Sequence, residues 1–220
     1  MDIMEAIKQR HSVRRYENKR IEGEVLDKLK KAIQDINDES GLNFQLVLDE
    51  PKAFSGLMAK YGKITGVSNY IALVGKKGKD LDRLCGYYGE KLVLEIQRLG
   101  LGTCWVALTY KKVPSAFTVR KGERLTVVIS VGYAKARGIP HKSKPISQVS
   151  DVTDNSPSWY VDGVEAALLA PTAMNQQKFF FRLDGDKVTV SAGLGFYAKM
   201  DLGIAQYHFE VATGKKVEIK

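Results

Sequence analysis

Basic and hydroxyl side chains alternate near the start of the chain, in the segment Arg10-His11-Ser12-Val13-Arg14-Arg15-Tyr16. In an extended backbone, residues two apart point to the same side, so Arg10, Ser12 and Arg14 are expected to converge on one anion. A phosphate monoester carries about −1.5 to −2 charges and three acceptor oxygens, which suits two guanidinium groups and a hydroxyl. The segment therefore predicts a phosphate site, with a solvated basic surface as the alternative.

A second basic segment, His141-Lys142-Ser143-Lys144-Pro145, follows a predicted strand at 125–131. Lys142 and Lys144 offer ammonium groups to the same kind of anion, although lysine lacks the planar donor fork of arginine. The alternative is an ordinary basic loop.

Residues 170–177, with the sequence APTAMNQQ, combine a helix-ending proline with polar side chains. Pro171 disfavours helical geometry at the residue before it and so ends the preceding helix. The Thr172 hydroxyl and the Asn175 amide both offer hydrogen bonds to a flat heterocycle with alternating donors and acceptors. This turn is the most specific of the candidate binding segments.

Composition narrows the class of protein. A net charge of +9 over 220 residues is compatible with a nucleic acid, an anionic membrane or a phosphorylated small molecule as partner. The sequence shows no nucleic-acid-binding signature, no apolar run near the roughly 20 residues of a membrane span, and no leader at its N-terminus. Cys85, Cys104 and three scattered histidines make neither a disulfide framework nor a metal site. We therefore expect a cytoplasmic protein with no nucleic-acid, membrane or metal partner, in which Cys104 is a packing residue.

Hydrophobic periodicity predicts the elements that must position these side chains. Helices are expected at 2–9, 22–38, 80–99, 159–169 and 200–210, with a short one at 113–118. Strands are expected at 44–48, 69–74, 103–108, 125–131, 179–183 and 188–192, the last two as a hairpin. Gly100 stands where a helix C-terminal glycine belongs. The fold class is α+β, and 135–158 is predicted to be loop.

Four segments in this order resemble the FMN-dependent nitroreductase superfamily. Arg-x-Ser-x-Arg-x-Tyr at 10–16 resembles its phosphate-binding segment, and 142–144 resembles its basic Lys-x-Arg pair. Residues 89–108 are similar to its central helix and Gly-Leu-Gly turn. Residues 169–179 are similar to its Ala-Pro-Ser-x-x-Asn-x-Gln-Pro-Trp turn, although Lys178 replaces the proline.

The resemblance implies a central antiparallel or mixed sheet with flanking helices, and one FMN site. The implied FMN contacts are Arg10, His11, Ser12, Arg14, Trp105, Val106, Ala107, Lys142, Lys144, Pro171, Thr172, Asn175 and Gln177. It also implies that NADH or NADPH delivers hydride to flavin N5 and that a small-molecule acceptor then receives it, so that no side chain needs to act as an acid or base. The alternatives are flavin binding without reductase turnover, dehalogenase or flavin-modifying chemistry, and a scaffold that has lost its flavin. No dinucleotide fingerprint distinguishes NADH from NADPH.

The candidate segments divide unequally along the chain. Residues 1–150 hold both basic segments, whereas 151–220 hold the proline turn. In the typical family the two parts come from different subunits of a dimer. Residues 22–48 weakly resemble 159–183, which indicates an internal duplication. We expect a fused pseudo-dimer in which both halves pack as one globular unit, forming a monomer with a single site.

Overall fold

The computed structural model describes residues 1–57 and 61–220, which belong to two compact units. Unit 1 comprises Met1–Gln9, Asp82–Lys91 and Pro140–Lys220, and unit 2 comprises Arg10–Leu81 and Leu92–Ile139. Helix α4 (Leu81–Arg98) therefore contributes to both. These boundaries differ from a division into 1–150 and 151–220, and the predicted organisation into two duplicated halves stays a prediction.

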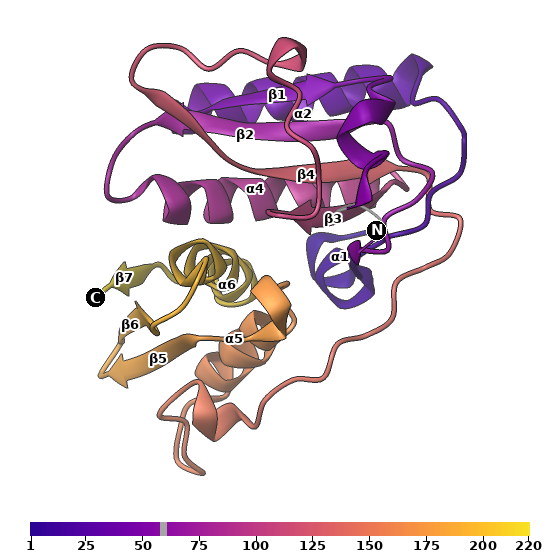
Figure 1. The fold of residues 1–220 in the computed structure, drawn as a ribbon. Helices are drawn as coiled ribbons and strands as arrows, with labels where there is room; N and C mark the ends of the chain where they lie inside the picture. The colour runs from indigo at the N-terminus through magenta and orange to yellow at the C-terminus, as the bar shows by residue number, and fades with distance from the viewer. Residues whose placement is uncertain (58–60) are drawn as a thin grey trace. The chain divides into compact units, whose positions relative to one another are not determined.

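Unit 2 is built on a four-stranded antiparallel sheet in the order β1-β2-β4-β3 (Figure 1). Its strands are β1 (Asn43–Val47), β2 (Tyr70–Lys76), β3 (Gly102–Val106) and β4 (Glu123–Gly132). Helix α2 (Gly23–Ser40) packs against β1 and buries Leu29, Ile33 and Ile36, the apolar stripe that its 3.6-residue period predicts. Unit 2 also contains two short 3-10 helices, η1 (Pro51–Phe54) and η2 (Pro114–Ala116).

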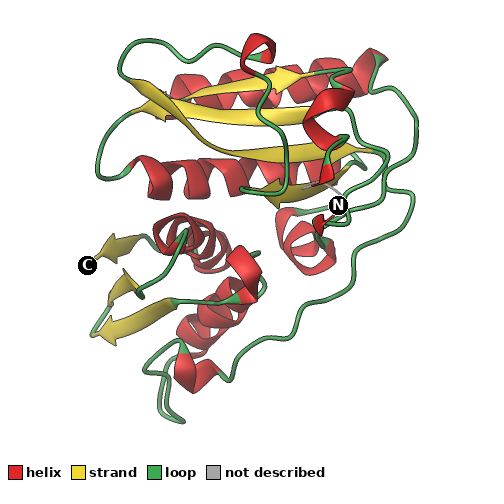
Figure 2. Ribbon diagram, viewed as in Figure 1, coloured by secondary structure: helices red, strands yellow, loops and turns green. Residues whose placement is uncertain are grey.

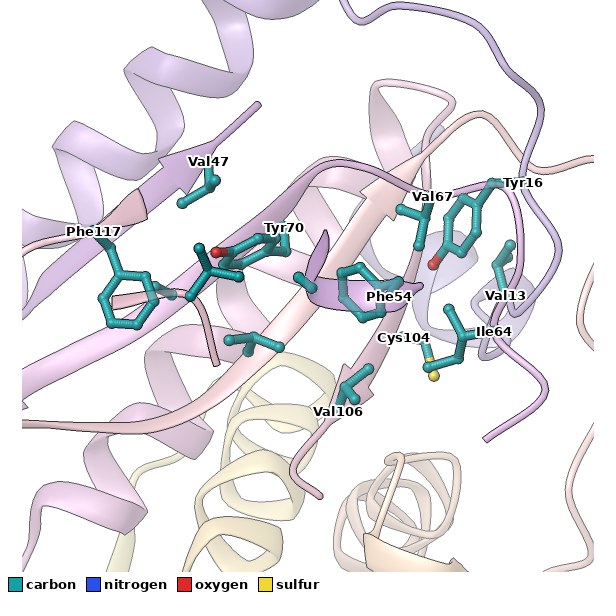
Figure 3. Packing of buried hydrophobic residues seen from close by; sticks show 14 of the residues in the cluster. Val13, Tyr16, Val47, Phe54, Ile64, Val67, Tyr70, Cys104, Val106 and Phe117 are labelled. Atoms are coloured by element: carbon teal, nitrogen blue, oxygen red, sulfur yellow. The ribbon is translucent and has the colours of Figure 1, made fainter. Parts of the chain in front are cut away.

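The core of unit 2 gathers side chains from distant parts of the chain on one side of this sheet (Figure 3). Tyr70 of β2 packs edge-on against Phe54, with ring centroids 5.9 Å apart. Val13 and Tyr16, from the basic N-terminal segment, join the same cluster as Cys104 of β3. The core therefore holds the basic segment next to β3.

Unit 1 combines helices with a smaller mixed sheet (Figure 2). Its helices, besides the first part of α4, are α1 (Ile3–Gln9), α5 (Ser158–Leu168) and α6 (Ala198–Thr213), with 3-10 helices η3 (Ile146–Gln148) and η4 (Ala173–Asn175). The strands β5 (Phe179–Asp184) and β6 (Lys187–Ala192) form a hairpin, and β7 (Val217–Ile219) pairs parallel to β6. Phe209 of α6 stacks on Phe181 of β5 with centroids 4.9 Å apart. This ring pair joins the helical layer to the sheet.

The structure confirms the α+β class, the predicted long helices and the hairpin, with ends shifted by up to three residues. Gly100 has φ of 79°, as expected for a helix C-terminal glycine. The α-helix predicted at 113–118 is wrong, since only the 3-10 turn η2 forms there. The segment 135–158 contains η3, and β7 was not predicted because three residues are too short to show a periodicity. Within the described residues, no helix is long and apolar enough to cross a membrane.

Candidate functional site

The basic N-terminal segment of unit 2 runs extended beside β3. The Val13 N–H donates to the Thr103 carbonyl at 2.8 Å, and the Tyr16 N–H donates to the Thr65 carbonyl at 3.0 Å. The backbone is therefore extended where it pairs with Thr103 and Thr65. Its side chains do not alternate strictly, because Val13 and Tyr16 are buried whereas Arg14 and Arg15 are both exposed.

Arg10, Ser12 and Arg14 all act on the thiol of Cys104. Burial raises the pKa of Cys104, while the positive charge of Arg14, a hydrogen bond with Ser12 and the charge of Arg10 oppose that rise. The three side chains differ in exposure, since Arg10 is buried and Arg14 is exposed. A thiol with a raised pKa is a poor nucleophile, which agrees with a packing role for Cys104.

A glycine that the sequence did not single out touches the same segment. A Cβ atom at Gly138 would lie 2.6 Å from both the His11 Cβ and the Ser12 carbonyl oxygen. Residue 138 must therefore be a glycine for residues 133–139 to lie against the basic segment at 10–16. Arg137 precedes Gly138 in the chain. An isolated glycine in a polar loop carries no signal from which this contact could be predicted.

The remaining candidates of unit 2 lie at the end of β3. Val106 is buried in the core, while Trp105 points to the other face of the sheet and is half-buried. The strand ends at Val106, so Ala107 belongs to the following loop. These residues directly follow Cys104, whose thiol is influenced by the charges of Arg10 and Arg14.

In unit 1, the predicted turn from Thr172 to Gln177 has an unusual backbone. Met174, Asn175 and Gln177 have φ values of 52°, 54° and 44°, in the left-handed region that normally favours glycine. Such a conformation costs roughly 1–2 kcal/mol per residue for other amino acids. Such residues persist only where surrounding contacts hold them in place.

The basic loop of unit 1 supplies one set of these contacts. The side-chain amides of Asn175 and Gln177 donate to the Lys142 carbonyl at 2.8 and 3.2 Å. In return, the Lys144 backbone N–H donates to Gln177 Oε1 at 2.8 Å, and its ammonium group donates to the Gln176 carbonyl at 2.7 Å. The structure thus brings Lys142 and Lys144 together with Asn175 and Gln177. Pro171 precedes the turn, and Thr172 Oγ1 accepts the Gln177 N–H at 3.1 Å.

Asp201 of α6 supplies the second set, and the sequence analysis missed it. Its Oδ1 accepts the Ala173 N–H at 2.9 Å, and its Oδ2 accepts the Gln176 amide at 2.7 Å. Asp201 is only 2% exposed, and burial raises the pKa of its carboxyl group to about 6, against the effect of these hydrogen bonds. An acidic residue in the first turn of a helix ordinarily faces solvent, so its position gives no hint of this contact.

Neither unit offers a metal centre. Across residues 1–57 and 61–220, no three His, Cys, Asp or Glu side chains are grouped closely enough to bind a metal ion. The site residues in unit 2 are cations and a hydroxyl near a thiol, and those in unit 1 are amides, hydroxyls and lysines around a strained turn. Both sets suit an organic phosphate with a polar ring system rather than a metal.

The chain is similar to nitroreductases in both sequence and structure. The model of the family described as "Putative TM nitroreductase" matches residues 2–213. The structure is similar to that of a nitroreductase described as putative from Thermotoga maritima MSB8, with 27% identity and a TM-score of 0.70 over 96% of this chain and 83% of that one. No match is found among curated proteins.

Two further solved structures share the fold at lower identity. One is the FMN-dependent nitroreductase of Clostridium difficile R20291, with 20% identity and a TM-score of 0.51 over 69% of this chain and 98% of that one. The other is a protein of Parabacteroides distasonis ATCC 8503 described as a putative NADH dehydrogenase/NAD(P)H nitroreductase, with 21% identity and a TM-score of 0.52 over 70% of this chain and 98% of that one. Since the family model covers nearly the whole chain, the protein belongs to the nitroreductase family of oxidoreductases.

Proposed function

We propose that the protein is an FMN-dependent NAD(P)H oxidoreductase that passes reducing equivalents to a small-molecule acceptor. Family membership supports an oxidoreductase, and fold relatives carry the names FMN-dependent nitroreductase and NAD(P)H nitroreductase. When bound, FMN supplies the ring system that accepts a hydride and donates it onward. The protein's own task is to bind and orient the flavin, the nicotinamide and the acceptor.

The observation that carries this proposal is the position of the basic segment, which pairs with β3 through Ser12 and Val13 and places Arg10 and Arg14 on either side of Ser12 in the chain. Two guanidinium groups and a hydroxyl on one short segment match the charge and the acceptor oxygens of a phosphate monoester. Hydrogen bonds to charged groups contribute roughly 1.5–3 kcal/mol each. We assign the FMN phosphate to these residues, with His11, Lys142 and Lys144 as further contacts.

The turn of unit 1 fits the flavin ring. Asn175 Nδ2 donates to Lys142, and Asn175 Oδ1 accepts a hydrogen bond from Gln177 at 2.9 Å. A side-chain amide has two donor hydrogens and two acceptor lone pairs, so one of each remains for a ligand. We assign ring contacts to Pro171, Thr172, Asn175 and Gln177. The backbone of 105–107, with the sequence WVA, is assigned as a further ring contact.

We also propose that the chain is a duplicated, fused pseudo-dimer. A Cβ atom at Gly86 of α4 would lie 2.1 Å from the Met200 carbonyl oxygen, and one at Gly203 of α6 would lie 2.0 Å from the Arg83 carbonyl oxygen. Each glycine stands three residues after the residue whose carbonyl the other glycine meets. Such a reciprocal contact is typical of two elements related by a twofold axis. We expect a monomer that binds one FMN, which light scattering and flavin titration measure together.

The state of the two cysteines bears on the cellular compartment. Cys85 and Cys104 are buried thiols that form no disulfide. Free thiols persist in reducing compartments, where reduced nicotinamide is also available. We therefore propose a cytoplasmic location.

Substitution of Arg14 by Glu tests the phosphate assignment. The exposed Arg14 side chain lies near the Cys104 thiol, so Arg14→Glu places a negative charge beside the proposed phosphate. We expect the dissociation constant for FMN to rise at least about 100-fold, as two lost charge-assisted contacts imply. Arg15→Glu is the matched control, because it makes the same charge change at the exposed neighbouring residue, which pairs with Thr65. Equal loss in both variants would reduce the effect to net charge, and equal retention would remove the phosphate from this position.

The visible absorption spectrum, recorded before and after adding FMN and then NADPH or NADH, tests the activity. Bands that appear with one equivalent of FMN and bleach with nucleotide support a one-site reductase. Flavin that binds but does not bleach favours a flavin protein with other chemistry, and no binding in excess FMN favours a scaffold. A DNA gel shift in place of flavin binding would instead support a basic nucleic-acid-binding protein.

A further inference from the structure

The turn from Thr172 to Gln177 is held from two sides that differ in chemistry. On one side, the basic loop contributes backbone carbonyl, backbone N–H and ammonium contacts. On the other side, a single carboxylate, that of Asp201, binds the backbone of Ala173 and the side chain of Gln176. Asp201 contacts the turn immediately before its first left-handed residue, Met174, and again just after its second, Asn175.

The Asp201 contact extends to the loop that leads into α6. The Gln176 amide that binds Asp201 also donates to the Phe196 carbonyl at 2.8 Å. Lys178 ties the same loop to the end of the turn, since its ammonium group donates to the Leu194 carbonyl at 2.8 Å. Asp201 thus lies at the centre of a network that joins the turn, the loop at 193–197 and the start of α6.

This arrangement is a poor one for stability alone. Asp201 is 2% exposed and receives its two hydrogen bonds from neutral donors. Burial of a carboxylate without a cationic partner is unfavourable. Glu210, nine residues further along α6, offers the contrast, because it accepts hydrogen bonds from the Lys216 ammonium, the Tyr87 hydroxyl and the Gln206 amide.

We propose that Asp201 is a positioning residue, whose carboxylate fixes the strained turn so that Thr172 and Asn175 are presented to the flavin ring. The proposal rests on the proposed function, since it concerns the same ring contacts. Asp201 itself acts through Ala173 and Gln176. The buried position of the Asp201 carboxylate lowers the stability of the fold but preorganises the binding turn.

The test compares Asp201→Asn with Glu210→Gln, two isosteric changes of buried carboxylates on one helix. An asparagine amide keeps one acceptor oxygen but turns an N–H group towards a donor of the turn, so one contact is lost. We expect Asp201→Asn to weaken FMN binding about tenfold, the ratio that corresponds to one such hydrogen bond, with a changed flavin absorption spectrum in the bound fraction. Its thermal midpoint as apoprotein should stay at or above that of the parent. Glu210→Gln should show the reverse, with a lower thermal midpoint and an unchanged FMN affinity and spectrum.

A second variant guards against a failure to fold. Gln176→Ala removes the other end of the same contact at a half-buried position, and we expect it to weaken FMN binding in the same direction. If the parent binds FMN and both variants keep its affinity and spectrum, the positioning role is wrong while the proposed function stands. If Asp201→Asn loses affinity only in proportion to lost folded protein, Asp201 is merely structural. If the parent itself binds no FMN at saturating concentration, the proposed function and this inference both fail.

Discussion

Unit 2 contains 22 basic and 12 acidic residues, whereas unit 1 contains 12 and 13, so their net charges are +10 and −1. The buried acidic and histidine side chains have the opposite distribution, although Arg10 of unit 2 is also buried. Among the described residues, the buried acidic and histidine side chains, Glu90, Asp201, His208 and Glu210, all belong to unit 1. Surface charge acts on ligands and is screened by salt, whereas buried charge acts on folding and responds to pH. The comparison suggests that unit 2 attracts a phosphorylated cofactor and that unit 1 sets the pH range in which the fold is stable.

The largest expected effect on the free energy of unfolding concerns the buried pair of Glu90 and His208 in unit 1. Both are fully buried, and His208 Nε2 lies 3.0 Å from Glu90 Oε1, while Nδ1 donates to the Ala166 carbonyl at 2.9 Å. Because His208→Leu removes a buried hydrogen bond to the Glu90 carboxyl group, it should lower the free energy of unfolding by about 3–5 kcal/mol. Urea denaturation of the apoprotein measures this change.

An exposed pair in unit 2 provides the control. Lys31 and Asp35 of α2 are joined at 2.8 Å on the surface, and such pairs contribute about 0.3–0.5 kcal/mol. Lys31→Ala should therefore change stability very little. The double variant Glu90→Leu with His208→Leu should be more stable than the sum of its single changes implies. If His208→Leu and Lys31→Ala lower the free energy of unfolding by the same amount, the buried pair does not distinguish unit 1 from unit 2.

The next effect is the pH dependence that Asp201 gives to unit 1. Its carboxyl pKa is raised from 3.8 to about 6 by burial, so the folded state binds more protons than the unfolded state between these values. Its contribution to stability is full below about pH 4 and is lost as the pH rises through 6, by at most about 3 kcal/mol. Asp201→Asn should therefore gain stability relative to the parent between pH 4 and pH 7, as urea denaturation at each pH measures.

The pKa shift of Glu210 has the opposite sign to that of Asp201, so Glu210 serves as the comparison. Burial alone would raise its pKa, but hydrogen bonds from Lys216, Gln206 and Tyr87 together lower the pKa of its carboxyl group below the usual value. Its stabilisation is present above the usual pKa and is lost as the pH falls. Glu210→Gln should thus lose most relative to the parent at neutral pH. A parallel pH response of both variants would contradict the assignment of these carboxylates.

The sequence predicted those parts of the molecule that depend on local pattern. The stripe of α2 and the turn at Gly100 follow from spacing and from glycine's freedom at positive φ. The extended course of the basic segment, which pairs with Thr103 and Thr65, agrees with the expectation from its sequence.

Contacts between distant segments were not predictable in this way. Asp201 reads as an ordinary helix-start residue, and Lys144 is predicted to bind a phosphate group, yet both bind the turn at 172–177. The left-handed backbone at Met174 is equally hidden, whereas Asn175 is of a residue type that occurs more often at positive φ. Such features depend on which segments meet in the fold, and a single sequence does not encode them in any short window.

The smallest effect compares one tyrosine in the core of each unit. Tyr160 and Tyr70 are both fully buried, but the Tyr160 hydroxyl donates to Asp151 Oδ1 at 2.7 Å, whereas the Tyr70 hydroxyl has no hydrogen-bond partner among residues 1–57 and 61–220. Burial raises the pKa of Tyr70 to about 12, so its hydroxyl stays neutral. Removing a bonded hydroxyl costs about 1.5–3 kcal/mol when its partner is charged, while removing an unsatisfied one is neutral or stabilising by about 1 kcal/mol. Tyr160→Phe should therefore destabilise the apoprotein and Tyr70→Phe should not, as paired thermal denaturation measures. Equal losses would show that the two core hydroxyls contribute alike to stability, and the contrast between the two units would then be restricted to the charged residues.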